Sequence, residues 1–313
     1  MNELMMIHIA VVLVVKNQRR YIDQSISSVV SQLKSGDKLI VVDDGSTDGT
    51  EIVCQQFLGN EYVEYIGFAN SKGLTYRLIE AIERLPENTF ILRQDGDDLS
   101  LPGRIHRFRS FFGCLPEGTL IASEVDFVDE EGFKKGVSKC SRARENNFDM
   151  RFGNFLVHGS VGFLKKDYDA IGGYDPRLRY AQDFALWSKW IEKFGTDSVI
   201  LIDKPYYALR LHSTSISKKK RLPQLLTGVA IICQIPCQVR DWDDVATRLK
   251  FYAEIHRIVR NSNASVDAKV DVGVYLFKNG QILESLIMFC FGIRSLTRLV
   301  KGMRHLLRLR FIL

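Results

Sequence analysis

The first hundred residues alternate between continuous apolar runs and segments with helical periodicity. Residues 7–15 form an apolar run rich in β-branched side chains, which is typical of a strand covered on both faces. Apolar positions then recur at helical spacing from Ile22 to Leu33, before a stop at Gly36. Further strands are predicted at 38–42, 62–66 and 89–92, and further helices at 51–57 and 75–85. This alternation predicts parallel βαβ units in a doubly wound α/β sheet.

The pattern changes after about residue 120. Shorter strands and an aromatic-rich helix at 184–194 are predicted up to residue 211. The run Lys218-Lys219-Lys220-Arg221 is interpreted as an exposed linker, and the chain beyond it is predicted to be mainly helical. We therefore expect two domains, an α/β domain over residues 1–217 and a helical extension over residues 218–313.

Charge is divided unevenly between these two parts. The chain carries 43 Lys and Arg against 37 Asp and Glu, a net charge of +6. Residues 214–313 contain 17 basic and 7 acidic side chains, which leaves 26 and 30 for residues 1–213. The body is mildly acidic and the extension is basic. Nucleic-acid binding is disfavoured because the body is acidic and the extension has no recognisable motif.

The cysteines and the N-terminus bear on the compartment. The six cysteines are scattered without metal-ligand spacing, which favours a reducing cytoplasm over a disulfide framework. The first residues show no secretory signal, and the apolar run at 7–15 is too short to cross a bilayer. The sequence therefore predicts a cytoplasmic protein.

The C-terminal residues suggest a contact with a membrane surface. No acid follows Glu284. Five basic residues share one predicted helical face: Arg294, Arg298, Lys301, Arg304 and Arg308. A basic amphipathic helix is attracted to anionic headgroups, so we expect peripheral contact with the inner face of the cytoplasmic membrane. The alternative is a helix packed on the body with its basic face in solvent.

Two acidic clusters follow predicted strands. In the first, Asp43 and Asp44 precede Gly45 and Ser46, and these groups suit hydrogen bonds to a base and a ribose. The alternative is a turn whose hydroxyl caps the next helix. Because ligands of doubly wound sheets bind beyond the carboxyl ends of strands, the position of this cluster favours a site.

In the second cluster, three carboxylates lie within four residues, at Asp95, Asp97 and Asp98. They repel one another unless a cation or hydrogen-bond donors neutralise them. Hard oxygen ligands suit Mg²⁺ or Mn²⁺, which take further ligands from phosphates and water. A solvated acidic turn is the alternative.

Five sequence blocks in order resemble the family 2 glycosyltransferases of bacterial surface-polysaccharide type. The blocks are VVDDGSTD, NSKGLTYRLIEAI, ILRQDGDDLSLPGR, VHGSVGFLKKDYDAIGGYDPRLRYAQDFALWSKW and LRLHSTSIS, within residues 7–217. The resemblance implies a Rossmann-like mixed sheet of the glycosyltransferase A type, a DxD motif and transfer with inversion at the anomeric carbon. It also makes residues 1–217 the catalytic domain.

The resemblance assigns roles to the acids of both clusters. It implies that Asp43 and Asp44 contact the base and ribose, and that Asp95 lies near the ribose and diphosphate. Asp97 matches the principal metal ligand. The role of Asp98 stays open between supporting the turn and binding the metal.

Two further residues match the family pattern later in the chain, and two arginines are further candidates. Asp183 matches the general base, and a carboxylate there suits proton removal from an acceptor hydroxyl; it also suits a helix N-cap. His212 is expected to bind the metal or the diphosphate, with a surface-loop histidine as the alternative. Arg77, like Arg93, is a candidate for phosphate contact or for an ordinary ion pair.

The chain departs from the family pattern at four positions that carry no essential carboxylate. Val14 stands where a proline is common, Lys16 where an aromatic residue is common, and Ile79 where an asparagine is frequent. Gln182 replaces the usual glutamate before the candidate base. Base contacts near Lys16 and acceptor contacts near Gln182 are therefore expected to differ.

These observations predict an enzyme that uses Mn²⁺ or Mg²⁺ and transfers a sugar from a nucleotide-diphosphate donor, expected to be a UDP-sugar. The expected acceptor is a hydroxyl of a glycan or a lipid-linked glycan. A sugar-phosphate nucleotidyltransferase is one alternative, but the glycine-rich phosphate loop of that class is missing at Val15 to Gln18. The other is a non-catalytic sugar-nucleotide-binding assembly partner.

Overall fold

The computed structural model describes residues 9–111, 116–138, 154–213, 215, 221–232 and 251. The chain divides into two compact units: Met1–Asn147 with Asn154–Ser215, and Phe148–Gly153 with Ile216–Leu313. The second unit contains helix α9 (Arg221–Ile232). Of the predicted linker, Lys218 to Arg221, residues 218–220 lie outside the described residues, and Arg221 is the first residue of α9. The predicted basic helix at 294–308 also lies outside them.

The first unit is built on a nine-stranded sheet in the order β3-β2-β1-β4-β8-β6-β9-β5, with β7 paired to β6. Its strands are β1 (Ile9–Val15), β2 (Lys38–Asp43), β3 (Val63–Gly67), β4 (Phe90–Asp95), β5 (Leu99–Ser100), β6 (Leu120–Val128), β7 (Lys134–Val137), β8 (Val161–Leu164) and β9 (Val199–Arg210). Its helices are α1 (Ile22–Val30), α2 (Thr50–Gln55), α3 (Leu74–Glu83), α4 (Arg104–Arg109), α6 (Lys165–Ala170) and α7 (Gln182–Phe194), with 3₁₀ turns η2 (His158–Ser160) and η3 (Thr196–Ser198).

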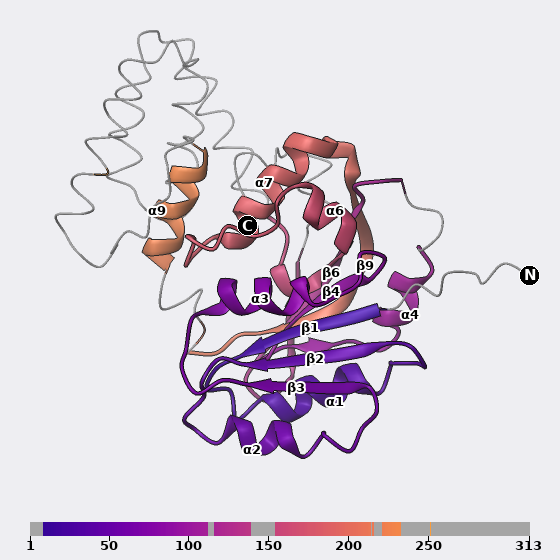
Figure 1. Ribbon diagram of the computed structural model, residues 1–313, viewed down its shortest axis with the longest axis vertical. Helices are drawn as coiled ribbons and strands as arrows, with labels where there is room; N and C mark the ends of the chain where they lie inside the picture. The colour runs from indigo at the N-terminus through magenta and orange to yellow at the C-terminus, as the bar shows by residue number, and fades with distance from the viewer. Residues whose placement is uncertain are drawn as a thin grey trace, which may run out of the picture. The chain divides into compact units, whose positions relative to one another are not determined.

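The sheet has a parallel half and a mixed half. Strands β3, β2, β1 and β4 run parallel, as the alternation of the first hundred residues predicts. Strand β8 then pairs antiparallel with both β4 and β6, while β6 and β9 are parallel. The predicted mixed α/β sheet is confirmed. Figure 1 shows α3 on one side of β1 to β3, and α1 and α2 on the other.

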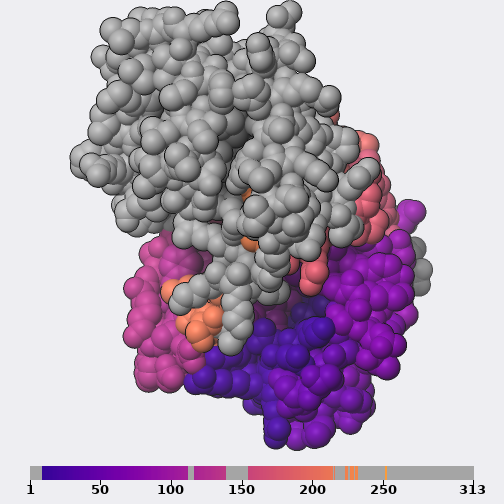
Figure 2. Space-filling view, turned by 90° about the vertical axis from the view of Figure 1, so that its left-hand side faces the viewer, coloured from indigo at the N-terminus to yellow at the C-terminus, as the bar shows by residue number. Residues whose placement is uncertain are grey.

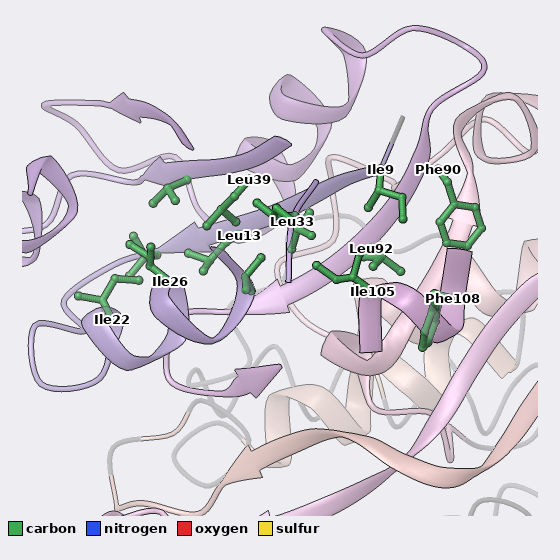
Figure 3. Packing of buried hydrophobic residues seen from close by; sticks show 14 of the residues in the cluster. Ile9, Leu13, Ile22, Ile26, Leu33, Leu39, Phe90, Leu92, Ile105 and Phe108 are labelled. Carbon is green, nitrogen blue, oxygen red and sulfur yellow. The ribbon is translucent and has the colours of Figure 1, made fainter. Parts of the chain in front are cut away.

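The main core lies on the face of the sheet that α1 and α4 cover. Alternate residues of β1, among them Leu13, pack with Ile22 and Ile26 of α1 and with Phe108 of α4 (Figure 3). Each such side chain contributes about 1.5 to 3 kcal/mol by leaving water. In Figure 2 the indigo and purple atoms, which belong to about the first hundred residues, lie side by side. The core therefore fixes the strands whose ends carry the acidic clusters.

The register brings both acidic clusters to the end of β1. Val15 of β1 pairs with Asp43 of β2, and Val14 pairs with Asp95 of β4. The two clusters thus flank the central strand at its carboxyl end, where doubly wound sheets bind ligands. None of the helices in the described ranges has the length and apolar character needed to cross a membrane.

Candidate active site

A tight turn carries the second acidic cluster from β4 to β5. The backbone N–H of Asp98 donates to the carbonyl of Asp95 across it, at 3.2 Å. Gly96 lies against β1, and a Cβ atom there would approach Cγ2 of Val15 to 2.9 Å. Real side chains essentially never pack that closely. Glycine therefore lets the turn sit directly on the end of β1.

The middle acid of this turn faces a histidine from the segment after β9. Oδ2 of Asp97 lies 2.8 Å from Nε2 of His212. Gln18, from the loop between β1 and α1, donates to the same oxygen at 3.3 Å. The Asp97 side chain is 18% exposed and the His212 side chain 1%. The structure thus joins two predicted metal ligands that are 115 residues apart, and leaves the carboxylate partly open.

The third acid of the turn is used inside the protein. Asp98 accepts a hydrogen bond from the Tyr207 hydroxyl and another from the backbone N–H of Arg210, both at 2.8 Å. Burial, followed by the negative charges of Asp97 and Asp95, raises the pKa of Asp98 well above its ordinary value, although these two hydrogen bonds oppose the shift. Asp98 therefore fastens β9 to the turn, and both its oxygens are occupied.

Arg210 is a site residue that sequence reasoning did not single out. Its guanidinium donates to the carbonyl of Asp97 and to the side chain of Gln24, each at 2.8 Å. It also lies over the ring of Tyr21, 4.9 Å from the centroid, and that ring contacts His212 at 5.1 Å. Arg210 is buried, so its charge acts on the turn and the sheet edge.

Asp95 is anchored by buried neighbours from β4 and β9. Arg93 donates to its Oδ1 at 2.8 Å, and the Tyr207 hydroxyl accepts from its backbone N–H at 3.1 Å. Burial raises the pKa of Asp95, while the positive charge of Arg93 opposes that shift. His158 lies 3.4 Å from Arg93, and burial together with this charge lowers the pKa of His158 well below its ordinary value. Among the described contacts Arg93 serves as an anchor for Asp95.

The first acidic cluster is more deeply enclosed. Asp43 accepts from the backbone N–H of Ser46 at 2.8 Å and from the Tyr65 hydroxyl at 3.3 Å. Asp44 is buried too, and its two oxygens accept bonds from the segment 71–73. The carboxylates of Asp43 and Asp44 are thus both the groups that stabilise the turn after β2 and the groups predicted to contact a nucleotide.

Asp44 and Arg77 form a buried ion pair. Nε of Arg77 donates to Oδ1 of Asp44 at 2.8 Å, and the guanidinium lies 3.4 Å from the ring centroid of Phe68. Burial alone would raise the pKa of Asp44, but its hydrogen bonds lower it below the ordinary value. The described contacts of this pair organise the loop between β3 and α3. Direct contact of either residue with a nucleotide stays a prediction.

Asp183 lies in the first turn of α7. Its Oδ2 accepts a hydrogen bond from Nδ2 of Asn154 at 2.7 Å. The preceding residue, Ala181, has a left-handed backbone conformation with φ 52°. Burial raises the pKa of Asp183, and the negative charge of Asp95 raises it further. The structure therefore places the candidate base at the start of α7, with one carboxylate oxygen bound to Asn154.

A small cavity opens beside the Asp97–His212 pair. It has a volume of about 210 Å³ and is lined by residues 17–21 together with Asp48, Glu130 and Ser213. Gln18 connects this cavity to Asp97 through its hydrogen bond. Polar and charged groups from the segments after β1, β2, β6 and β9 therefore line an accessible space next to the candidate metal ligands.

The fit to a divalent ion is tested by the ligands present. Within the described parts of the chain, no group of three or more His, Cys, Asp or Glu side chains is placed to hold a metal. The pair Asp97 and His212 offers one carboxylate and one imidazole. This number suits an ion that takes its other ligands from diphosphate oxygens and water.

The fold and the acidic edge define a glycosyltransferase with the A-type fold. The chain belongs to glycosyl transferase family 2, whose family model matches residues 10–172. This result confirms the resemblance noted in the sequence and makes the chain a glycosyltransferase.

Two bacterial relatives share the body of the chain. It is 28% identical over 189 residues to glycosyltransferase EpsE of Bacillus subtilis, covering 59% of this chain and 67% of that protein. It is 26% identical over 177 residues to amylovoran biosynthesis glycosyltransferase AmsE of Erwinia amylovora, covering 55% and 64%. The chain thus spans about two thirds of the length of each relative.

Solved structures share the fold at low sequence identity. S. aureus TarS 1-349 has a TM-score of 0.54 at 14% identity, covering 86% of this chain and 81% of that one. The mannosyltransferase PcManGT from Pyrobaculum calidifontis, in complex with GDP-Man and Mn²⁺, has a TM-score of 0.52 at 14% identity, covering 91% and 79%. These likenesses support the A-type fold.

Proposed function

We propose that this enzyme transfers a sugar from a UDP-sugar to a hydroxyl of a glycan or lipid-linked acceptor during surface-polysaccharide synthesis, with inversion at the anomeric carbon. The observation that carries the proposal is the pairing of Asp97, in the turn that follows β4, with His212. AmsE is named for amylovoran biosynthesis, and a TarS structure contains UDP-GlcNAc. Both support this donor and acceptor chemistry.

Asp97 and His212 are the residues that would hold a divalent ion, Mn²⁺ or Mg²⁺. When bound, such an ion supplies positive charge that stabilises the departing nucleoside diphosphate. Asp98 and Arg210 contribute by fixing Asp97, because both connect the acidic turn to the end of β9. The PcManGT complex contains Mn²⁺, which supports the use of a divalent ion.

Asp183 is the proposed general base. A carboxylate accepts the proton of the acceptor hydroxyl as that oxygen bonds to the anomeric carbon and the bond to the diphosphate breaks. Attack from the side opposite the leaving group inverts the configuration. The pKa of Asp183, raised by burial, brings this carboxyl closer to the pH at which a base works well.

The test is turnover of a panel of UDP-, GDP- and dTDP-sugars by the full chain, measured as release of nucleoside diphosphate. We expect release from a UDP-sugar in Mn²⁺ and its loss in EDTA. Asp183→Asn should retain UDP binding and lose at least about 100-fold in turnover, the range that general-base catalysis contributes. Asp203→Asn, an exposed residue of β9, is the matched control. Full turnover by Asp183→Asn would remove it as the base.

The proposed membrane contact rests on the basic residues between 294 and 308. Flotation with vesicles of phosphatidylglycerol, compared with vesicles of phosphatidylcholine, tests it. We expect flotation only with the anionic lipid. Replacing the five basic residues of the predicted face with glutamine should abolish it, and equal flotation of both proteins would refute the contact.

A further inference from the structure

Asn154 uses both ends of its side-chain amide. Its Oδ1 accepts from the backbone N–H of Leu156 at 3.1 Å, and its Nδ2 donates to Oδ2 of Asp183 at 2.7 Å. An oxygen that faces an N–H donor fixes which end of the amide is which, so the NH₂ group must point toward Asp183. A local turn thus aims a neutral donor at the candidate base.

The rest of the surroundings of Asp183 leaves it able to act. The backbone N–H groups of Phe184 and Asp183 at the start of α7 also favour the ionised carboxylate, because they lower the pKa of Asp183. Each carboxylate oxygen has two acceptor positions, so a lone pair is left for an incoming hydroxyl. Among the described residues, the charge of Asp95, from the end of β4, adds to burial in raising the pKa of Asp183, and the charge of Asp183 adds to burial in raising the pKa of the Tyr174 phenol. Neither of these two groups is a cation that could replace the Asn154 donor.

We propose that Asn154 is a positioning residue that fixes the carboxylate of Asp183 for proton removal from the acceptor hydroxyl. The inference rests on the proposed function, because it needs Asp183 as the base. The proton moves from the hydroxyl to Asp183 while the hydroxyl oxygen bonds to the anomeric carbon and the diphosphate leaves with the electron pair. Asn154 takes no proton itself.

A merely structural role for Asn154 predicts different behaviour. If Asn154 only shaped its turn, the loss of its bond to Leu156 would be the whole effect. Asn60 makes the same bond, because its Oδ1 accepts from the backbone N–H of Tyr62 at 2.9 Å, without facing a catalytic candidate. Asn60→Ala is therefore the matched control. In Asn154→Asp, one carboxylate oxygen can still accept the bond from the Leu156 N–H. The NH₂ donor that faces Asp183 is replaced by a second oxygen, which can only accept.

The sign of the expected pH effect follows from the bond. Asn154 donates to the ionised carboxylate and favours it, so its loss raises the pKa of Asp183. The base works when ionised, and kcat/KM therefore rises with pH through this pKa. Asn154→Ala should move that acid limb upward by about one pH unit, and Asn154→Asp by more, since it sets one carboxylate against another.

Two measurements on the full chain test the proposal. The first is the pH profile of Mn²⁺-dependent hydrolysis of UDP-glucose and UDP-N-acetylglucosamine, with UDP binding measured in parallel. We expect about tenfold lower kcat/KM below the shifted limb for Asn154→Ala, unchanged UDP affinity, and a normal profile for Asn60→Ala. The second needs no substrate: the side-chain carboxyl ¹³C signal of Asp183, assigned by its loss in Asp183→Asn, should titrate at higher pH in both Asn154 variants.

The outcomes separate this inference from the proposed function. If Asp183→Asn keeps its turnover, the base assignment fails. If Asp183→Asn is inactive while the Asn154 variants keep the original acid limb and carboxyl titration, only the positioning role fails. The positioning role is also overturned if Asn60→Ala loses as much activity as Asn154→Ala, and neither the acid limb of kcat/KM nor the Asp183 carboxyl signal shifts.

Discussion

Two acidic turns end neighbouring parallel strands, yet their carboxylates are used differently. After β2, Asp44 is 2% exposed and accepts bonds from Ser71, Lys72, Gly73 and Arg77. After β4, Asp97 is 18% exposed and meets His212 beyond β9. A carboxylate whose bonds are all made within the protein organises a loop, whereas one left partly open beside a histidine is available to a ligand.

The same contrast appears inside the second turn. Asp98, like Asp44, has both carboxylate oxygens in hydrogen bonds within the protein, with Tyr207 and Arg210 as the donors. Within four residues the turn therefore combines an open acid with an acid that fastens it to β9. We expect substitutions of the open acid to change turnover and substitutions of the occupied acids to change stability.

The largest effect is expected for Asp97→Asn. It removes the negative charge that would hold a divalent cation next to the diphosphate. Mn²⁺-dependent turnover should therefore fall at least about 100-fold. The free energy of unfolding should change by no more than about 1 kcal/mol, because the side chain is partly exposed. Release of UDP from a UDP-sugar and urea unfolding measure the two quantities.

A Mn²⁺-dependent thermal shift in the presence of UDP gives an independent reading of the same variant. The unmodified chain should show the shift and Asp97→Asn should lose it. Asp203→Asn, on the exposed face of β9, should keep both turnover and shift. A normal Mn²⁺-dependent thermal shift in Asp97→Asn would contradict the claim that Asp97 is the open acid available to a metal ion.

Asp44→Asn is expected to show the opposite signature. It leaves the buried guanidinium of Arg77 without its carboxylate, which costs about 3 kcal/mol in the free energy of unfolding. The folded pKa of Asp44 is lowered, so its contribution is present at neutral pH and lost as the pH falls through and below its ordinary value of 3.8. Urea unfolding at neutral and acidic pH should show a difference from the unmodified chain that shrinks on acidification.

A constant difference across that pH range would show that Asp44 is not the titrating group. Loss of UDP binding in a fully folded Asp44→Asn protein would point to a direct nucleotide contact instead. Either result would weaken the division between the two turns.

Local pattern predicted the parallel half of the sheet and the position of both acidic turns. Asp97, His212 and Asp183 came from the order of family blocks, and the structure places the first two in contact. Shorter strands in a mixed sheet were predicted after residue 120, but neither the bounds of β8 nor its antiparallel pairing with β4, about 70 positions away, was predicted. Short apolar runs do not encode such a pairing.

The same limit explains which site residues were missed. Asn154 and Arg210 act through partners 29 and 113 residues away. Arg210 lies in the block LRLHSTSIS beside His212, but the sequence does not show that it binds the carbonyl of Asp97. The sequence alone does not distinguish the two adjacent aspartates, Asp43 and Asp44. They differ because the chain after β3 turns back onto Asp44, which is a tertiary property.

Gly96→Ala should have the next effect in size. The added Cβ would meet Val15 at 2.9 Å, so the turn must shift, at a cost of about 1 to 3 kcal/mol in unfolding free energy. Because Asp97 is the next residue, turnover should fall as well. Gly59→Ala is the matched control, since a Cβ there would meet nothing within 4 Å. Equal stability of the two variants would show that the turn does not depend on close contact with β1.

The smallest effect compares two tyrosine hydroxyls, one for each turn. Tyr207→Phe removes the group that joins Asp98 to the backbone of Asp95, with bonds of 2.8 and 3.1 Å, and should cost about 1 to 2 kcal/mol. Tyr65→Phe removes one longer bond, of 3.3 Å to Asp43, and should cost about 0.5 kcal/mol. Urea unfolding of both variants measures the two losses in unfolding free energy and therefore their ratio. If Tyr65→Phe costs as much unfolding free energy as Tyr207→Phe, the turn after β4 is not held more strongly than the turn after β2. In that case the Tyr207 hydroxyl of β9 does not position the turn that carries Asp97.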